Sequence, residues 1–195
     1  MSNYISVYDD VLKPNQCQHL IEKFEDSKQQ WIKTELKGHR SFTEININLN
    51  EDWQEYVDIL YKTLRPYVDK YITDNKIDKV KQWPEKFGFE QIRFKKYEVN
   101  NVDEFQEHVD VMDYASAKRF LVFFLYLKDN EGGHTSFPEY DMKVQPKTGR
   151  LLMFPPMWNY KHIGHKPIEQ PKYIVGSYLH YLSLIHISEP TRRLI

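Results

Sequence analysis

Residues 119–156 read RFLVFFLYLKDNEGGHTSFPEYDMKVQPKTGRLLMFPP, and this stretch decides the fold class. Its apolar runs are short, and turn-forming residues separate them at 131–133, 146–149 and 155–156. No helical period continues across these interruptions, and each run has the length of a strand. The stretch therefore predicts successive antiparallel strands joined by tight loops.

The same pattern covers the C-terminal half of the chain. Strands are expected near 89–98, 105–110, 119–128, 134–137, 150–154, 162–166 and 172–181. Many short antiparallel strands in succession are typical of a β-sandwich or a jelly roll.

The N-terminal half carries the expected helices. Pro14 suits the first turn of one helix, and apolar residues three and four apart predict a longer helix from Trp53 to Ile72. Alternating residues predict a half-buried strand at 42–49 and a short strand at 4–8. Together with the C-terminal strands, these elements predict one α+β domain in which helices pack on one face of the β-structure.

Composition narrows the class of protein. Hydrophobic residues make up 41% and charged residues 28% of 195 residues, which is the balance of one folded domain. A net charge of −1 gives no bulk positive field for nucleic acid or an anionic membrane. The longest apolar run, 120–127, is far shorter than the about 20 residues of a membrane helix. A single cysteine, Cys17, and no signal-peptide pattern at the start lead us to expect a cytoplasmic protein.

His108 and Asp110 are the first candidate metal ligands. Residues i and i+2 of a strand point to the same face, so this imidazole and carboxylate can reach one ion. An exposed histidine and aspartate at a strand end is the alternative. A second histidine, His162, heads another expected strand far downstream. Two histidines and one carboxylate form the facial triad that binds non-haem Fe(II).

Lys172 is a candidate for binding an anion. It opens the apolar strand at 172–181 with the parity of Ile174 and Tyr178, so its side chain is predicted to point inward. A buried lysine needs an anion, and the far carboxylate of a dicarboxylic acid that chelates the iron would supply one. An ordinary lysine at a strand entry is the alternative. The spacing of His162 and His165 leaves zinc as a rival metal, although no cysteine cluster accompanies it.

From about residue 91 to residue 181 the sequence resembles the prolyl 4-hydroxylase branch of the Fe(II)/2-oxoglutarate-dependent dioxygenases. The motifs that carry the resemblance agree in order and spacing, and they are HVD at 108–110, GGHTSFP at 132–138, VQPKTG at 144–149, HIG at 162–164 and KYI at 172–174. The stretch 4–25 resembles the opening of that family, so the likeness covers about residues 4–181.

The resemblance implies the fold and the domain boundaries. The expected fold is a double-stranded β-helix, a jelly roll of eight antiparallel strands, with the N-terminal helices packed against the major sheet. Residues 1–182 would form one dioxygenase domain, helical to about residue 80 and with a jelly-roll core at about 89–181. Residues 183–195 do not fit this fold and are expected to be a non-native or disordered tail.

The resemblance also implies the site. Iron would be bound by His108, Asp110 and His162. The cosubstrate 2-oxoglutarate would be bound by Lys172 and Tyr126 at its C5 carboxylate, and lined by Tyr97 and Thr135. No further catalytic residue beyond the iron centre is required, O2 is the second cosubstrate, and ascorbate is a candidate reductant.

The implied activity is hydroxylation of a prolyl or related residue in a peptide or protein, with release of succinate and CO2. The same iron chemistry on a small molecule, a free amino acid or a nucleic acid remains an alternative, as does a non-catalytic jelly-roll binding module. The near-neutral charge makes nucleic acid and membranes unexpected partners. The sequence specifies neither the substrate nor the oligomeric state.

Overall fold

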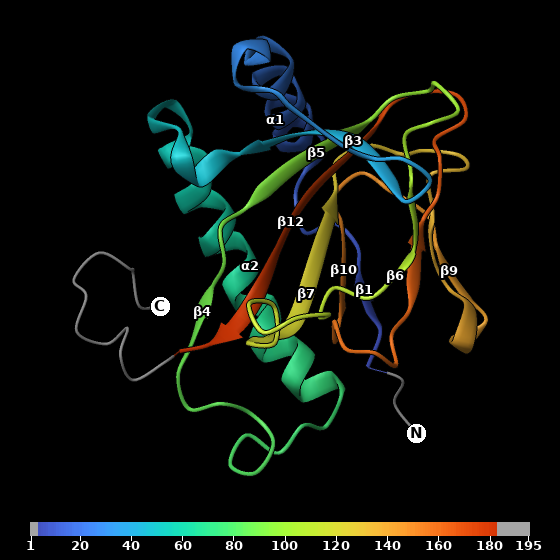
Figure 1. Cartoon of the computed structure of the whole chain (residues 1–195). Helices are drawn as coiled ribbons and strands as arrows, with labels where there is room; N and C mark the ends of the chain where they lie inside the picture. Colours follow the sequence, from blue (N-terminus) through green and yellow to red (C-terminus); the bar gives the residue numbers. More distant parts are fainter. Residues whose placement is uncertain (1–3, 183–195) are drawn as a thin grey trace.

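The computed structural model describes residues 4–182, and Figure 1 shows helices packed beside a strongly curved β-structure. The described α-helices are α1 (Pro14–Asp26) and α2 (Gln54–Asp74). The expected tail at 183–195 lies outside the described residues. No helix within 4–182 is long and apolar enough to cross a membrane.

The described strands form one 12-stranded sheet that curves back on itself, so that two halves of the sheet face each other (Figure 1). The strands are β1 (Ser6–Tyr8), β2 (Ile32–Leu36), β3 (Arg40–Asn46), β4 (Phe87–Phe89), β5 (Arg93–Tyr97), β6 (Phe105–His108), β7 (Arg119–Tyr126), β8 (Thr135–Phe137), β9 (Met142–Val144), β10 (Arg150–Phe154), β11 (His162–Gly164) and β12 (Lys172–Tyr181). The half that we call the major sheet has the order β1-β10-β7-β12-β5-β3, with β2 beside β3 and β4 beside β12. The half that we call the minor sheet has the order β6-β11-β8-β9, and one pair of residues, Arg40 and Phe105, joins β3 to β6. All pairs are antiparallel, as expected for a double-stranded β-helix.

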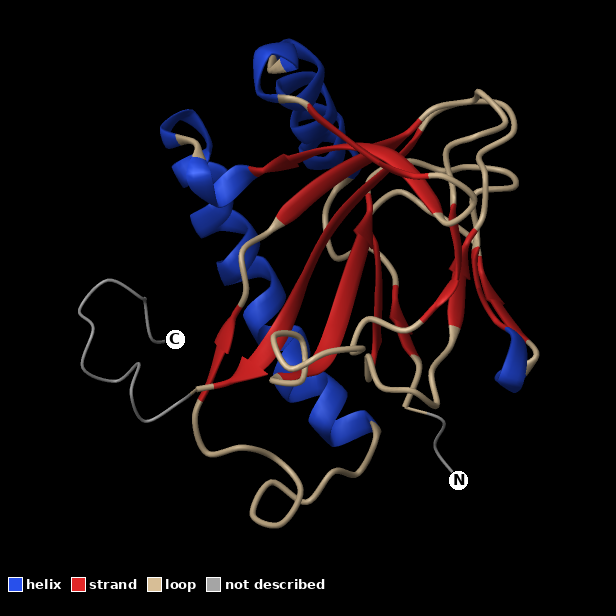
Figure 2. Ribbon diagram, viewed as in Figure 1, coloured by secondary structure: helices blue, strands red, loops and turns tan. Residues whose placement is uncertain are grey.

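The two helices cover the outer face of the major sheet (Figure 2). The ring of Phe24 on α1 stacks on Phe94 of β5 with centroids 4.5 Å apart. Leu60 and Leu64 of α2 are buried in the same cluster. The apolar residues that recur every three or four positions along α2 therefore form the face of the helix that packs on the sheet. This packing confirms the expected position of the N-terminal helices.

A second apolar cluster fills the space between the two sheets. Tyr126 of β7, Phe137 of β8 and Phe154 of β10 are fully buried members of it. The major sheet is therefore buried on both faces. Burial on both faces explains why β7 is a nearly continuous apolar run rather than an alternating one.

The prediction of a strand at 42–49 is wrong at its C-terminal end. The strand β3 stops at Asn46, and Ile47–Leu49 form a 3-10 turn. The side chain of Asn48 explains the change. Its Oδ1 accepts a hydrogen bond from the backbone N–H of Ile92 at 2.7 Å, in the place of a strand partner. Leu49, expected to be half-buried, is 70% exposed.

Other differences concern strand boundaries. The single strand expected at 89–98 is two strands, β4 and β5, and the sequence did not reveal β2 or β9. Charged residues such as Lys33 and Glu35 hide the strand period of β2, which lies at the edge of the sheet and pairs only with β3.

Two glycines with left-handed backbone provide a matched test of the packing between the start of α1 and β10. Gly149 has φ +75°, and an added Cβ would lie 2.2 Å from the carbonyl oxygen of Leu12, whereas Gly38 has φ +72° with nothing within 4 Å. Both alanine variants carry the left-handed cost of about 1–2 kcal/mol. We expect Gly149→Ala to lose about 1–3 kcal/mol more than Gly38→Ala in urea unfolding, because of the added clash. Equal losses would contradict this packing.

Candidate metal centre and cosubstrate pocket

The pairing of β6 with β11 brings the predicted metal ligands together. His108 ends β6 and His162 begins β11, and the two residues are direct partners in the antiparallel ladder. Asp110 follows β6, and its Oδ1 and Oδ2 lie 3.6 Å from Nε2 of His108 and of His162, respectively. One ligand atom from each of these three residues lies within 4.8 Å of the other two.

Backbone carbonyls fix the tautomer of both histidines. Nδ1 of His108 donates to the carbonyl of Gln106 at 2.7 Å, and Nδ1 of His162 donates to the carbonyl of Tyr160 at 3.0 Å. A carbonyl can only accept, so each Nδ1 carries the proton. Each Nε2 therefore presents a lone pair toward Asp110, which is the arrangement that metal-binding histidines adopt.

Two buried polar atoms at the centre of this group have no hydrogen-bond partner within the described chain, and they are Oδ2 of Asp110 and Nε2 of His162. Leaving such atoms buried and unpaired is costly, and each of them would be satisfied by a cation. Two imidazole nitrogens and one carboxylate are the donor set of a non-haem Fe(II) site with open positions. The residues therefore fit an iron ion.

The electrostatics of the group agree with metal binding. Burial lowers the pKa of His162 to about 4, although the nearby Asp110 carboxylate opposes this shift. Burial acts in the opposite sense on Asp110, but His162, His108 and the Tyr178 hydroxyl outweigh it and hold the pKa of the carboxyl below its usual value. Near neutral pH this gives a neutral His162 and an ionised Asp110, which are the forms that bind a metal.

Further side chains orient the metal ligands, and this role was not predicted from the sequence. The Tyr178 hydroxyl donates to Oδ1 of Asp110 at 2.9 Å. The guanidinium of Arg119 lies 4.0 Å from the Tyr178 ring centroid and is itself held by Glu90. Phe105 stacks on the ring of His108 at 3.5 Å. The inward parity of Tyr178 was the only one of these features that could be inferred from the sequence.

Lys172 points inward, as its parity predicted, and is fully buried. Its Nζ donates to the carbonyl of His165 at 2.8 Å and lies 4.2 Å from the Tyr97 ring centroid. Within residues 4–182 it forms no ion pair with a carboxylate. Burial, with a smaller contribution from Lys95, lowers its pKa to about 7. The amine is therefore placed to bind an anion that enters the barrel.

The other residues expected around the cosubstrate lie in the same interior. Tyr97 is the direct partner of Lys172 between β5 and β12. The hydroxyls of Tyr126 and Thr135 are hydrogen-bonded at 2.6 Å, and both residues are buried. The backbone of Gly133 packs against Lys172 so closely that an added Cβ would lie 2.9 Å from its Cδ. Lys172, Tyr97, Tyr126 and Thr135 are all buried and none of them lines the open cavity, so we call their surroundings the enclosed end of the jelly roll.

His165 does not join the metal ligands. Its Nε2 is hydrogen-bonded to the Ser136 hydroxyl at 2.7 Å, and its ring stacks on His134 with centroids 4.0 Å apart. In the described chain, the group of histidine, cysteine and acidic residues that could hold a metal ion consists of His108, Asp110 and His162. The zinc pairing of His162 with His165 is therefore not formed.

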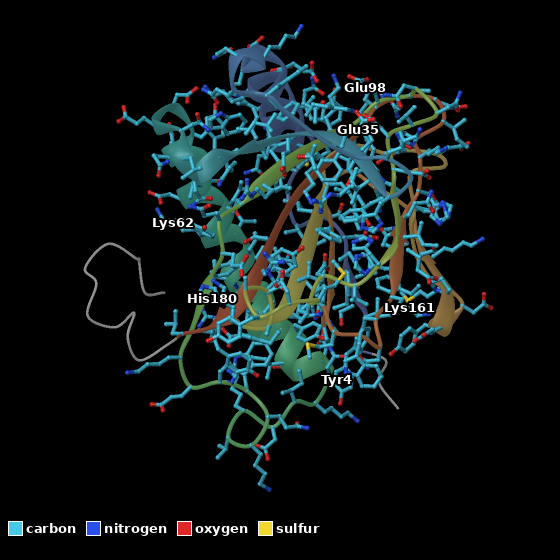
Figure 3. All side chains as sticks on the ribbon, viewed as in Figure 1. Tyr4, Glu35, Lys62, Glu98, Lys161 and His180 are labelled. Carbon is cyan, nitrogen blue, oxygen red and sulfur yellow. The ribbon has the colours of Figure 1, made fainter. Side chains whose placement is uncertain are left out.

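An open cavity of about 1540 Å³ reaches the metal ligands from the surface. His108 and Asp110 lie on its wall, whereas Lys172 does not. The cavity is lined by residues of β3, β5, α2 and the loop after β6, and it extends to Lys62 and His180, both labelled in Figure 3.

A comparison with protein families gives a match within the jelly roll. Residues 92–180, somewhat less than half of the chain, match the model of the 2OG-Fe(II) oxygenase superfamily. Over these residues the chain is similar to that superfamily. The matched range runs from the start of β5 almost to the end of β12, so it contains every residue of the metal group. An oxygenase of this superfamily uses Fe(II), 2-oxoglutarate and O2, which agrees with the donor set described above.

Solved structures share the fold of this chain over most of its length. The viral collagen prolyl hydroxylase vCPH from Paramecium Bursaria Chlorella virus-1, in its 2OG complex, has a TM-score of 0.64 and 18% identity, and the match covers 92% of this chain and 97% of that chain. A prolyl hydroxylase from Trichoplax adhaerens, in complex with a hypoxia inducible factor peptide fragment, has a TM-score of 0.71 and 16% identity over 92% and 84%.

A prolyl-4-hydroxylase from Pseudomonas putida has a TM-score of 0.66 and 14% identity over 93% of this chain and 95% of that chain. At such identities the likeness shows the fold. A comparison with curated protein sequences gave no match for this chain.

The metal group predicts a graded response to substitution. We expect Asp110→Ala to weaken Fe(II) binding by more than about 100-fold and Tyr178→Phe by about 10–100-fold, because the first removes a ligand and the second its hydrogen-bond donor. Asp113→Ala serves as the control, because Asp113 is an exposed carboxylate whose hydrogen bonds are made within its own loop, chiefly with Ser116. Anaerobic calorimetric titration with Fe(II) measures all three, and equal affinities for the Asp110 and Asp113 variants would contradict the site.

Proposed function

We propose that this protein is an Fe(II)- and 2-oxoglutarate-dependent oxygenase that hydroxylates a prolyl or related residue in a peptide or protein, with conversion of 2-oxoglutarate to succinate and CO2. The observation that carries the proposal is the pair of unpartnered buried atoms, Asp110 Oδ2 and His162 Nε2, beside His108 at the wall of an open cavity. In this proposal His108, Asp110 and His162 hold Fe(II), which supplies, with 2-oxoglutarate and O2, the oxidising power to hydroxylate an unactivated C–H bond.

The residues of the enclosed end have the chemistry to bind 2-oxoglutarate. Lys172 would pair with the C5 carboxylate, because its buried ammonium has only a backbone carbonyl as a partner among the described residues. The Tyr126 hydroxyl, now bonded to Thr135, would donate to the same carboxylate. Tyr97 would contribute its ring, which already lies against Lys172. Together these residues would orient the cosubstrate between Lys172 and the metal.

The interior also protects the site from water. The rings of Phe154 and Phe137 lie 4.8 and 5.9 Å from the ring of His162, and all three residues are fully or almost fully buried. A dry wall behind the ligands limits side reactions of an oxidising centre. In this proposal the protein contributes binding, orientation and exclusion of water, and no other side chain needs to act as an acid or a base.

A peptide or protein substrate is favoured by the size of the cavity. Its volume of about 1540 Å³ exceeds the about 300–1,000 Å³ that is typical of a small-molecule site. Three of the similar structures are prolyl hydroxylases, and one of these is in complex with a peptide fragment. These observations support a prolyl residue over a free small molecule.

The lowered pKa of Lys172 predicts how binding of 2-oxoglutarate depends on pH. Below pH 7 the amine is charged and can pair with a carboxylate, whereas above pH 7 it must first take up a proton. We expect the affinity of the Mn(II)-loaded protein for 2-oxoglutarate to fall between pH 7 and 9, by at most about tenfold per pH unit.

The control for this prediction is Lys172→Arg, because a guanidinium stays charged over this range and should bind with little pH dependence. Calorimetric titrations at pH 6.5, 7.5 and 8.5 measure the difference. If the affinity for 2-oxoglutarate fell equally with pH in both proteins, a group other than Lys172 would be the one that titrates.

The prolyl hypothesis predicts a mass gain of one oxygen on proline-containing peptides incubated with the enzyme, Fe(II), 2-oxoglutarate and O2. His108→Ala and His162→Ala should abolish the gain, because each removes an iron ligand. His19→Ala, which changes an exposed histidine on α1, should leave it unchanged. Mass spectrometry of the peptides gives the answer. Oxygen gain on free amino acids alone, with none on any peptide, would contradict a peptidyl substrate.

A further inference from the structure

Lys95 lines the cavity beside the metal ligands and forms no ion pair with a carboxylate among the described residues. It lies on β5 two residues before Tyr97, so both side chains face the interior of the jelly roll. Its Nζ lies 4.7 Å from the centroid of the Phe42 ring, and the residue lines the same cavity as His108 and Asp110. Within the described chain Lys95 forms no ion pair, unlike its neighbour Lys96 on the opposite face of the strand.

Two arginines extend this positive wall. Arg93 lies two residues before Lys95 on β5, and Arg40 comes from the adjacent strand β3, with its guanidinium 5.6 Å from the Phe105 ring centroid. Both line the cavity, and neither has an ion pair among residues 4–182. Arg119 differs from them, because Glu90 accepts three of its hydrogen bonds.

The nearest acidic groups form no ion pair with Lys95. Glu44 is its direct partner between β3 and β5, but their side chains are not in ion-pair contact, and Glu44 Oε1 accepts a hydrogen bond from the Thr34 hydroxyl at 2.9 Å. Asp110 belongs to the metal group. Burial lowers the pKa of Lys95, and Glu44 and Asp110 oppose the shift without cancelling it. A half-buried ammonium in this state would be stabilised by an anion that arrives with a ligand.

The substrate is a better source of this anion than 2-oxoglutarate. Lys172 provides the cosubstrate with its own cation at the enclosed end, and Lys172 does not line the cavity. Lys95, Arg93 and Arg40 do line it, so they are reached from the side on which a peptide must enter. Arginine side chains are suited to bidentate contacts with a carboxylate.

We propose that Lys95 binds a carboxylate of the substrate close to the residue that is hydroxylated, and that Arg93 and Arg40, on either side of it, add positive charge to this part of the cavity. The inference rests on the proposed function and specifies its substrate class. The carboxylate can come from an acidic side chain next to the target proline or from the free α-carboxylate of a C-terminal target. Both sources offer the same chemistry to Lys95.

The test compares blocked peptides that differ by one charge. Acetylated and amidated Ala-Pro-Glu is compared with Ala-Pro-Gln, and acetyl-Ala-Pro with a free carboxylate is compared with its amide. The protein is first loaded anaerobically with Fe(II) and 2-oxoglutarate, and the visible charge-transfer band is recorded before any peptide is added. Peptide binding is then followed by the change in this band, and independently by calorimetry on the metal-free protein.

We expect the wild type to bind at least one acidic peptide about tenfold or more tightly than its neutral match, the range for a hydrogen bond to a charged group. In Lys95→Met this preference should disappear. Lys62→Met is the matched control, because Lys62 is an exposed lysine of α2 that lines the same cavity (Figure 3). It should keep the preference. Arg93→Gln should reduce the preference, which provides a second variant should Lys95→Met fail to fold.

The possible results test the role of Lys95 separately from the proposed function. Equal binding of acidic and neutral peptides by a wild type that shows the band would overturn the role of Lys95 and leave the proposed function standing. A Lys95→Met variant that keeps the preference but loses affinity for 2-oxoglutarate would assign Lys95 to the cosubstrate and overturn the inference. Absence of the band in folded wild type would overturn both.

Discussion

The antiparallel pairing of β6 with β11 is the constraint on which the candidate site depends. It sets His108 directly opposite His162, although the two residues are distant in the sequence. A slip of one residue in this register would turn one of the imidazoles to the other face of the minor sheet and separate it from Asp110. The inner apolar core and the stacked ring of Phe105 hold that register, so packing determines the geometry of the donor atoms.

The interior of the jelly roll tolerates polar groups that a purely structural core would exclude. Lys96, on the outer face of β5, is compensated by Glu25 and Glu98, as buried charges in stable proteins are. Lys172 and Lys95, on the inner side, have no such carboxylate within the described residues, and Asp110 and His162 have atoms without partners. Unpaired groups of this kind reduce stability, and they concentrate where ligands are expected to complete the structure.

Much of this architecture could be predicted from the sequence, because strand lengths, helix period and side-chain parity are local properties. The triad, the inward direction of Lys172 and the position of the helices could all be inferred in this way. The end of β3 could not, because it depends on a hydrogen bond from Ile92 to the Asn48 side chain across the sheet. The roles of Arg119 and Glu90 were also hidden, because their contact with Tyr178 forms only in the folded barrel.

The alternation of side chains along a strand predicts that both Lys172 and Lys95 point inward, and it does not distinguish their surroundings. They differ because one end of the barrel is closed and the other opens into the cavity. Lys172 lies at the enclosed end, where Gly133 packs on its side chain and the ring of Tyr97 covers its ammonium. Lys95 lies one strand away but opens into the cavity beside Phe42. Two cations on the same inner face therefore meet different ligands: one reaches only a molecule enclosed in the barrel, and the other reaches a molecule that still extends into solvent. On this argument the shape of the barrel, more than the identity of its residues, assigns one lysine to the cosubstrate and the other to the substrate.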